Sequence, residues 1–232
     1  MFIFSGIILD KDYYSKKLSA NKLKLCYDVA SPRIQQYLTE EINFVLQFIK
    51  PDMKVLEQGC GYGRVLEYLT EHAKTVVGID TSQESLDLAK GYLRTKSNYE
   101  LYNMNAEKLD FQSESFDLVI AIQNGISAFK VDPKKLVMEA LRVTKKEGYV
   151  LFSSYSENIW DARLEWFQRQ SEEGLLGDID LEKTGNGIII CKDGFKATTY
   201  SKGDFVDLMC QLQLKADITE VDNSSIFCVL KK

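Results

Sequence analysis

The sequence lacks several features that would assign a chemistry directly. It has a single histidine, His72, and its five cysteines include no C-x-x-C pair. Scattered cysteines in odd number favour free thiols in a reducing compartment over a disulfide framework or a zinc site, so no metal site is predicted. His72 falls where we expect the exposed end of a helix. A catalytic base would therefore have to be a Tyr, Asp, Glu or Cys side chain.

Charge and hydropathy exclude further classes of protein. The net charge is −5, whereas tight binding to a nucleic-acid backbone wants a basic face. The apolar start, Met1–Leu9, is too short to span a bilayer and lacks the basic start of a signal peptide. We therefore expect a cytoplasmic protein without a membrane partner, in which residues 1–9 form an edge strand or a flap. The 232 residues suffice for one large domain, or for one domain with a cap.

A glycine-rich turn between an apolar strand and a helical pattern is the most informative feature present. Residues 54–64 read Lys-Val-Leu-Glu-Gln-Gly-Cys-Gly-Tyr-Gly-Arg. Glycine permits the sharp turn and lets a ligand approach the backbone, and the following helix start offers free N–H groups. A second strand, 75–79, ends in Asp80, at a distance along the chain that suits a ribose hydroxyl pair. The pattern predicts a nucleotide-type site at the carboxyl ends of parallel strands.

The glycine spacing distinguishes between nucleotides. The dinucleotide fingerprint is G-x-G-x-x-G, but Gly59, Gly61 and Gly63 follow G-x-G-x-G. An acid, Glu57, also precedes the turn. A carboxylate there would repel a pyrophosphate and would suit an ammonium or sulfonium group. A nicotinamide oxidoreductase is therefore the least favoured enzyme class.

These residues resemble the first motif of the class I S-adenosylmethionine-dependent methyltransferases, an apolar strand and an acid followed by G-x-G-x-G. The resemblance continues through Asp80, residues 103–111, 116–122 and 142–152, and covers residues 51–155 and more loosely 200–232. Asn105 stands where that family usually has Asp. The resemblance implies S-adenosylmethionine as cofactor. The residues that it places at the cofactor are Glu57, Gly59, Cys60, Gly61, Gly63, Asp80, Thr81, Asn105, Ala106, Glu107 and Gln123.

The alternation of strands and helices over residues 52–155 predicts an α/β protein with a parallel, doubly wound sheet. The resemblance implies a Rossmann-like sheet of seven strands in the order 3-2-1-4-5-7-6, with the seventh antiparallel. We expect an N-terminal helical segment or flap over 1–50 and a methyltransferase domain over 51–232. Residues 156–200 would form a substrate-cap insertion, with a helix over 159–170 and a small antiparallel sheet.

Helix starts can be predicted from capping residues. Ser31-Pro32 and Asp132-Pro133 place a capping side chain before a proline at the first helical position. Residues 201–204 resemble a capping box. We expect the first of these helices to continue until Pro51.

The resemblance places residues 123–125 beside the donor methyl group. Gln123 and Asn124 could orient a polar substrate, or they could only cap the strand end, and Tyr27 is a third catalytic candidate. The segment lacks the (Asp/Asn)-Pro-Pro-aromatic motif of base-amine enzymes and the Pro-Cys or Thr-Cys nucleophile of cytosine-C5 enzymes. Both absences argue against a nucleic-acid substrate.

The substrate is expected between the N-terminal segment and the insertion. Candidate binding residues are Tyr27, Arg33, Tyr37, Asn124, Tyr155 and Trp160. Arginine could bind a carboxylate or phosphate, and the aromatic rings could enclose an amine or an apolar body. Taken singly, however, each of these residues is more often a core or solvated residue. Methyl transfer from a sulfonium expels a neutral thioether, so alignment in a dry site can suffice.

The leading hypothesis is therefore a methyltransferase acting on a small molecule. A methyltransferase of protein or tRNA, and a non-catalytic scaffold that retains the cofactor fold, are the alternatives.

Overall fold

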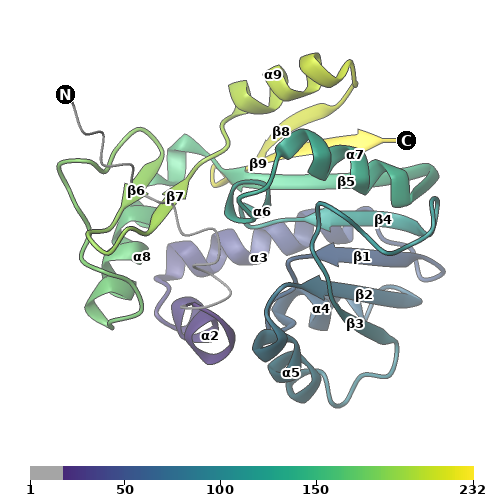
Figure 1. Cartoon of the computed structure of the whole chain (residues 1–232), viewed down its shortest axis with the longest axis horizontal. Coiled ribbons are helices and arrows are strands. Elements are labelled where there is room, and N and C mark those ends of the chain that lie inside the picture. Colours follow the sequence, from purple (N-terminus) through teal and green to yellow (C-terminus); the bar gives the residue numbers. More distant parts are fainter. Residues whose placement is uncertain (1–17) are drawn as a thin grey trace, which may run out of the picture.

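The computed structural model describes residues 18–232, so the edge strand or flap expected at residues 1–9 lies outside the described residues. A seven-stranded sheet forms the centre, in the order β3-β2-β1-β4-β5-β9-β8 (Figure 1). Strands β1 to β5 are parallel, and β9 runs antiparallel between β5 and β8. The predicted fold class and strand order are confirmed. The strands are β1 Lys54–Gln58, β2 Thr75–Asp80, β3 Tyr99–Asn103, β4 Phe116–Ala121, β5 Thr144–Tyr155, β8 Asp217–Val221 and β9 Ser225–Lys231.

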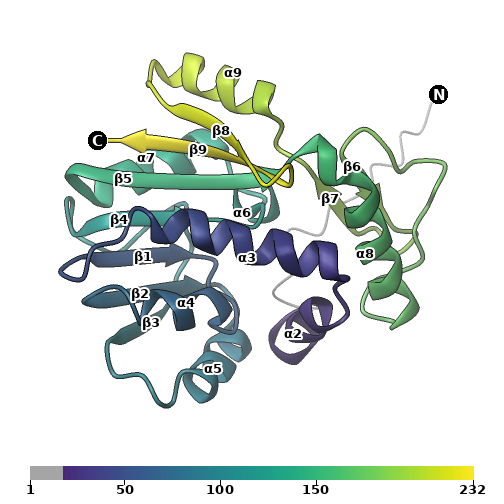
Figure 2. The same cartoon turned by 180° about the vertical axis from the view of Figure 1, so that it is seen from behind.

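Helices cover both faces of this sheet, because successive strand residues point to opposite faces. Val55 packs under α3, α4 and α5, whereas its neighbour Leu56 packs against the cluster formed with α6, α7 and α9. Figures 1 and 2 show the two layers from opposite sides. The helices are α2 Ala20–Asp28, α3 Pro32–Leu46, α4 Arg64–Leu69, α5 Gln83–Tyr92, α6 Gly125–Ala128, α7 Pro133–Val143, α8 Trp160–Glu172 and α9 Lys202–Leu212.

The predicted helix starts hold, with one difference in detail and one in length. Asp132 caps α7, and Ser201 and Asp204 form a reciprocal capping box at α9. Ser31 precedes α3 as predicted, but its hydroxyl makes no capping hydrogen bond. Helix α3 ends at Leu46 rather than near Pro51, because the N–H groups of residues 47–49 bond to the third preceding carbonyl and the chain continues as turns.

A third apolar cluster joins α2, the start of α3 and the segment 156–200. That segment contains a short 3-10 helix, Glu157–Ile159, then α8, and then the antiparallel pair β6 (Ile188–Ile190) and β7 (Lys196–Thr198). The helix and the small sheet agree with the sequence-based expectation. In Figure 2 the N-terminal end of α3 reaches α2 and α8 beside the sheet. We call α8, β6 and β7, with their connections over 156–200, the cap.

No helix within residues 18–232 is long and apolar enough to cross a membrane.

Candidate functional site

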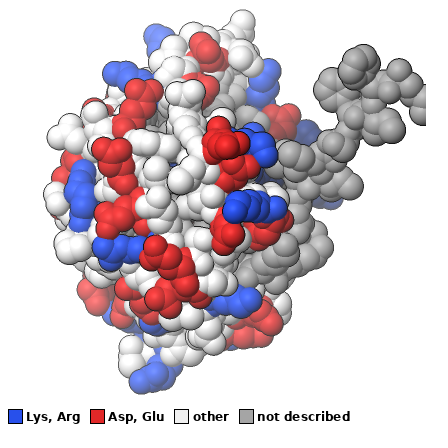
Figure 3. All heavy atoms as spheres, turned by 90° about the vertical axis from the view of Figure 1, so that its left-hand side faces the viewer, with Lys and Arg blue, Asp and Glu red and all other residues white. Residues whose placement is uncertain are grey.

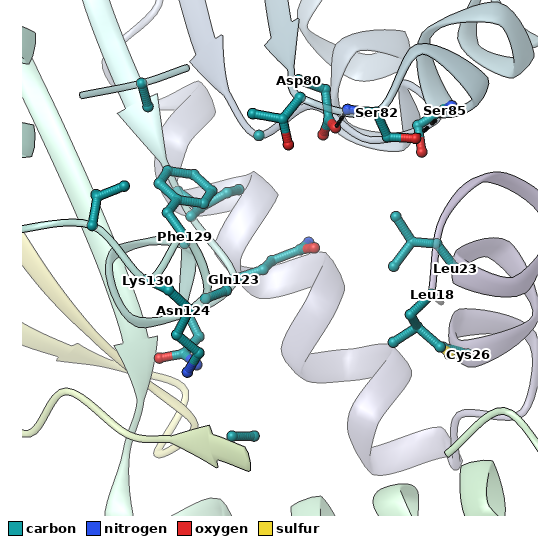
Figure 4. Close-up of a pocket in the computed structure, with 18 of the residues that line it drawn as sticks. Leu18, Leu23, Cys26, Asp80, Ser82, Ser85, Gln123, Asn124, Phe129 and Lys130 are labelled. Carbon is teal, nitrogen blue, oxygen red and sulfur yellow. Dashed lines mark hydrogen bonds between the residues drawn. The ribbon is translucent and has the colours of Figure 1, made fainter. Parts of the chain in front are cut away.

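A cavity of about 650 Å³ lies where the carboxyl ends of the parallel strands meet the cap (Figure 4). One part, the loop half, is lined by residues of the glycine turn, of the end of β2, of the segments after β2 and β3, and of the first turn of α5. These are Gly59, Ile79, Asp80, Thr81, Ser82, Ser85, Met104, Asn105, Ala106 and Glu107. The other part, the cap half, is lined by Lys130, Tyr155, Trp166, Phe167, Gln170, Phe195 and Ala197. Tyr27 of α2 and residues 122–125 after β4 also line the cavity.

Glycine is required in the turn that begins the loop half. Gly59, Gly61 and Gly63 all have positive φ, of 75°, 53° and 89°. A Cβ on Gly59 would lie 2.4 Å from the Phe129 ring, and one on Gly61 would lie 2.9 Å from Leu23. The N–H groups of residues 59 and 60 both donate to the carbonyl of Ile79. The turn is therefore pinned to β2 with its backbone close to its neighbours.

Asp80 is held rigidly at the end of β2. One carboxylate oxygen accepts the Gly61 N–H at 2.9 Å, and the other accepts the Ser82 N–H at 2.8 Å. Burial raises the pKa of Asp80, and these backbone hydrogen bonds oppose the shift. Each oxygen keeps lone pairs for further donors, so the carboxylate can accept a pair of ligand hydroxyls.

Buried polar groups with unused hydrogen-bonding capacity lie next to the turn. One oxygen of Glu57, both amide atoms of Gln58, and Nε and Nη2 of Arg64 have no hydrogen-bond partner among the described residues. Burial raises the pKa of Glu57 to about 8, and the Arg64 charge opposes this shift. The Arg64 guanidinium stacks over the ring of Tyr27, 4.8 Å from its centroid. A ligand with both an ammonium and a carboxylate group would give these atoms partners, because an ammonium favours the ionised form of Glu57 and a carboxylate can accept from Arg64.

The residues after β3 form the remaining wall of the loop half. The Asn105 side chain accepts the Glu107 N–H at 2.8 Å, which closes a tight turn. Glu107 pairs with Lys135 at 3.0 Å. The turn exposes Asn105, Ala106 and Glu107 to the cavity together, although Asn105 has already committed one acceptor site.

The two residues of the turn after β4 make different contacts. Gln123 and Asn124 both have positive φ, of 55° and 64°. The Gln123 side chain points into the cavity toward α2 (Figure 4), where the Tyr27 hydroxyl donates to its Oε1 at 3.0 Å. The Asn124 amide instead donates to Thr198 O at 2.9 Å and accepts from Ser154 at 2.7 Å. Asn124 thus joins β4, β5 and β7.

Sequence reasoning missed a buried carboxylate behind this turn. Glu41 of α3 is fully buried and accepts the Gln123 N–H at 3.0 Å, a group that also donates to Ser153 Oγ at 2.8 Å. Burial raises the pKa of Glu41 to about 7. An acid within the apolar stripe that includes Leu38, Ile42 and Val45 was a signal that could have identified it.

Three of the predicted substrate residues do not line the cavity. Arg33 pairs with Asp222 and also donates to its backbone carbonyl. Tyr37 is fully buried, with its ring 5.4 Å from that of Tyr155. The Arg163 guanidinium lies 5.8 Å from the ring centroid of Trp160.

Tyr27, Asn124 and Tyr155 do line the cavity, as do the predicted cofactor residues Gly59, Asp80, Thr81, Asn105, Ala106, Glu107 and Gln123. Cys60, Gly61 and Gly63 lie in the turn itself, and the Cys60 thiol is buried, which raises its pKa. The chemistry of the cap half was missed: Lys130, Trp166, Phe167, Gln170 and Phe195 were not predicted to line a site. Within residues 18–232 no group of three or more His, Cys, Asp or Glu side chains is placed to hold a metal ion.

Comparison with known proteins finds a family model that matches part of the chain. A methyltransferase-domain family model matches residues 56–152. An enzyme from Pseudomonas fluorescens described as a ubiquinone biosynthesis O-methyltransferase is 28% identical over 140 residues, or 60% of this chain and 56% of the relative. The chain thus spans about half the length of the curated relatives that it matches.

Solved structures agree with this assignment of the fold. A protein from Pyrococcus horikoshii superposes with a TM-score of 0.65 at 20% identity, covering 96% of this chain and 98% of that one. A SAM-dependent methyltransferase from Aquifex aeolicus gives 0.62 at 16% identity, covering 90% and 97%. At such identities the superpositions establish the fold only.

Proposed function

Because the chain carries a class I S-adenosylmethionine-dependent methyltransferase domain, we propose that it transfers a methyl group to a small molecule held in the cap half of the cavity. The loop half suits the cofactor. Asp80 would hold the ribose hydroxyls, and Asn105, Ala106 and Glu107 would border the adenine. The unbonded oxygen of Glu57 would accept from the ammonium of the amino-acid end of the cofactor, and the unbonded N–H groups of Arg64 would donate to its carboxylate. When bound, the cofactor supplies an electrophilic methyl group on a sulfonium.

The residues between the two halves act by alignment in this proposal. Gln123 extends into the cavity, and its side chain is fixed by the Tyr27 hydroxyl while its N–H is fixed by Glu41. Burial raises the pKa of Tyr27 far above its ordinary value, so this phenol stays protonated at neutral pH. It would therefore hold Gln123 in place as a hydrogen-bond donor, and it would not serve as a base. Holding two reactants in line inside a dry cavity provides a large share of such a rate enhancement.

The single observation that carries the small-molecule proposal is the continuity of the cavity. Its size falls within the range of about 300–1,000 Å³ that is usual for small-molecule sites. The described lining of the cap half is mainly aromatic and contains one lysine, Lys130, which is little for a polyanionic backbone. The similarity to a ubiquinone biosynthesis O-methyltransferase supports a small acceptor as well.

Methylation of a protein or tRNA would favour an open, basic groove near the turn after β4. Figure 3 shows the side of the molecule that carries the cap, where the described part of the surface has acidic and basic side chains interspersed. Among the described residues, Asn124 is buried and bonded to the cap, which limits the approach of a macromolecule to this turn. The small-molecule acceptor is therefore preferred over the macromolecular one.

The test is a calorimetric titration of the purified full chain with S-adenosylmethionine, followed by a screen of small acceptors for release of S-adenosylhomocysteine. Asp80→Asn should weaken cofactor binding by about tenfold or more, because the amide replaces a doubly accepting carboxylate. Asp87→Asn is the matched control, since Asp87 is an exposed acid on α5 that pairs with Lys90. Absence of binding at millimolar cofactor would overturn the proposal. Binding without transfer to any acceptor would support the non-catalytic scaffold.

A further inference from the structure

The cap half is lined mainly by aromatic side chains. Trp166 and Phe167 come from α8 and Phe195 from the loop between β6 and β7. The polar edge of Trp166 is already committed, because its Nε1 donates to Cys26 O at 2.6 Å. The Tyr155 ring packs near Tyr37, and the Arg163 guanidinium lies over it at 4.2 Å from its centroid. Walls of this kind select a flat, largely apolar body.

One charged side chain among the described residues lines this half. The Lys130 ammonium donates to the carbonyl of Lys196 at 3.2 Å, and no carboxylate within residues 18–232 forms an ion pair with it. The acids that line the cavity, Asp80 and Glu107, both belong to the loop half. Burial and the nearby Lys196 charge lower the pKa of Lys130, as expected for a cation without a counter-charge.

A purely structural role accounts for the position of Lys130 but not for its charge. Asn124, Ser127 and Lys130 are spaced three residues apart along α6 and its end, and all three bond to β7. Asn124 and Ser127 make their contacts to Thr198 with uncharged groups. A hydrogen bond to a carbonyl needs only one N–H. A neutral amide side chain at position 130 would supply it without the free-energy cost of partly burying an ammonium. The charge therefore calls for a second partner in the cavity.

The geometry points to an acceptor of defined class: a flat, mostly apolar molecule that carries one anionic group, with its body against the aromatic wall and its anion on Lys130. This inference rests on the proposed function, since it assigns the substrate class of the same site. Lys130 would act as a specificity-determining residue, and Asn124 and Ser127 would fix its distance from the turn that faces the cofactor half.

The experiment uses two probes of nearly equal shape, 2-naphthoate and 2-naphthamide, which differ by one negative charge. The full chain is first saturated with S-adenosylhomocysteine, and each probe is then titrated by calorimetry or ligand-observed NMR. The variants are Lys130→Gln, which keeps an N–H donor for Lys196 O, and Lys134→Gln. Lys134 is the matched control because it is exposed on the neighbouring α7 and does not line the cavity.

We expect the wild type to prefer naphthoate by about tenfold, or about 1.4 kcal/mol. Lys130→Gln should bring the two affinities to within about twofold while S-adenosylhomocysteine binding stays unchanged, and Lys134→Gln should keep the full preference. An equal or stronger affinity for naphthamide, no detectable naphthoate binding at millimolar concentration, or a preference that survives in Lys130→Gln would each overturn the inference. A wild type that fails to bind S-adenosylhomocysteine would instead count against the proposed function, so the two failures are distinguishable.

Discussion

Two buried carboxyls behind the cavity should make the stability of the cofactor-free protein depend on pH. Burial raises the pKa of Glu41 from 4.5 to about 7 and that of Glu57 from 4.5 to about 8. Between these values the folded state binds protons that the unfolded chain has released. The resulting stability is fully present below the unfolded pKa, and it is lost as pH rises through the folded pKa values.

Substitution of Glu41 isolates one of these contributions. The difference between 4.5 and about 7 corresponds to about 3 kcal/mol of unfolding free energy, because each pH unit is worth about 1.4 kcal/mol. Glu41→Gln keeps an oxygen that can accept the Gln123 N–H, and its new amide hydrogens can donate to the hydroxyls of Ser153 and Ser225, which face Glu41. The variant should thus resemble the wild type near pH 4 and be more stable by about 3 kcal/mol near pH 8.

The assay is urea unfolding of the wild type and Glu41→Gln across this pH range without cofactor, with unchanged m-values as the check on two-state behaviour. Glu40→Gln is the control, since Glu40 precedes Glu41 on α3 but is partly exposed. Glu40→Gln makes the same chemical change at the neighbouring position without altering the buried carboxyl of Glu41. The reasoning is refuted if the difference in unfolding free energy between wild type and Glu41→Gln does not grow with pH.

Three further predictions each concern a single residue. Gly59→Ala places a Cβ 2.4 Å from the Phe129 ring at a φ of 75°. It should therefore lower the melting temperature in calorimetry and prevent S-adenosylmethionine binding. Adding Phe129→Ala should restore part of the lost melting temperature, because it removes the clashing ring. Burial lowers the pKa of Lys130, so naphthoate affinity should fall as alkaline pH removes the Lys130 charge. Titrations at increasing pH should show this loss in the wild type and not in Lys130→Gln. Only Cys210 of the five cysteines is exposed, so intact mass after brief treatment of native protein with a thiol reagent should show one adduct.

Much of the fold could be predicted because its signals are local. Apolar runs mark the parallel strands. Capping residues such as Asp132 and Ser201 mark helix starts, because they bond to N–H groups only two or three residues further along the chain. The strand order came from the resemblance to a family, since periodicity does not specify which strands pair. The end of α3 was misplaced because Ile49 continues the apolar pattern while its N–H already bonds in a tighter turn.

The loop half of the site could be predicted for the same reason, whereas only Tyr155 of the residues that line the cap half was predicted. Gly59 and Asp80 belong to a motif whose residues lie within one strand-helix-strand unit. Lys130 and Phe195 are 65 residues apart in sequence and meet only when β7 docks on α6. The choice of Arg33 and Tyr37 assumed that the start of α3 faces the ligand. That helix instead turns Tyr37 into the core and Arg33 toward Asp222.

The short helix α6 connects these two halves mechanically. The two residues before α6, Gln123 and Asn124, both have left-handed backbone angles. Gln123 faces the cavity, where it bonds to Tyr27, and Asn124 bonds to the cap. Because Asn124, Ser127 and Lys130 all bond to β7, a change in the cap position must move the same turn that presents Gln123. Under the proposed function, this coupling would tie the position of the acceptor to the direction of methyl transfer, which matters for a reaction that depends on alignment.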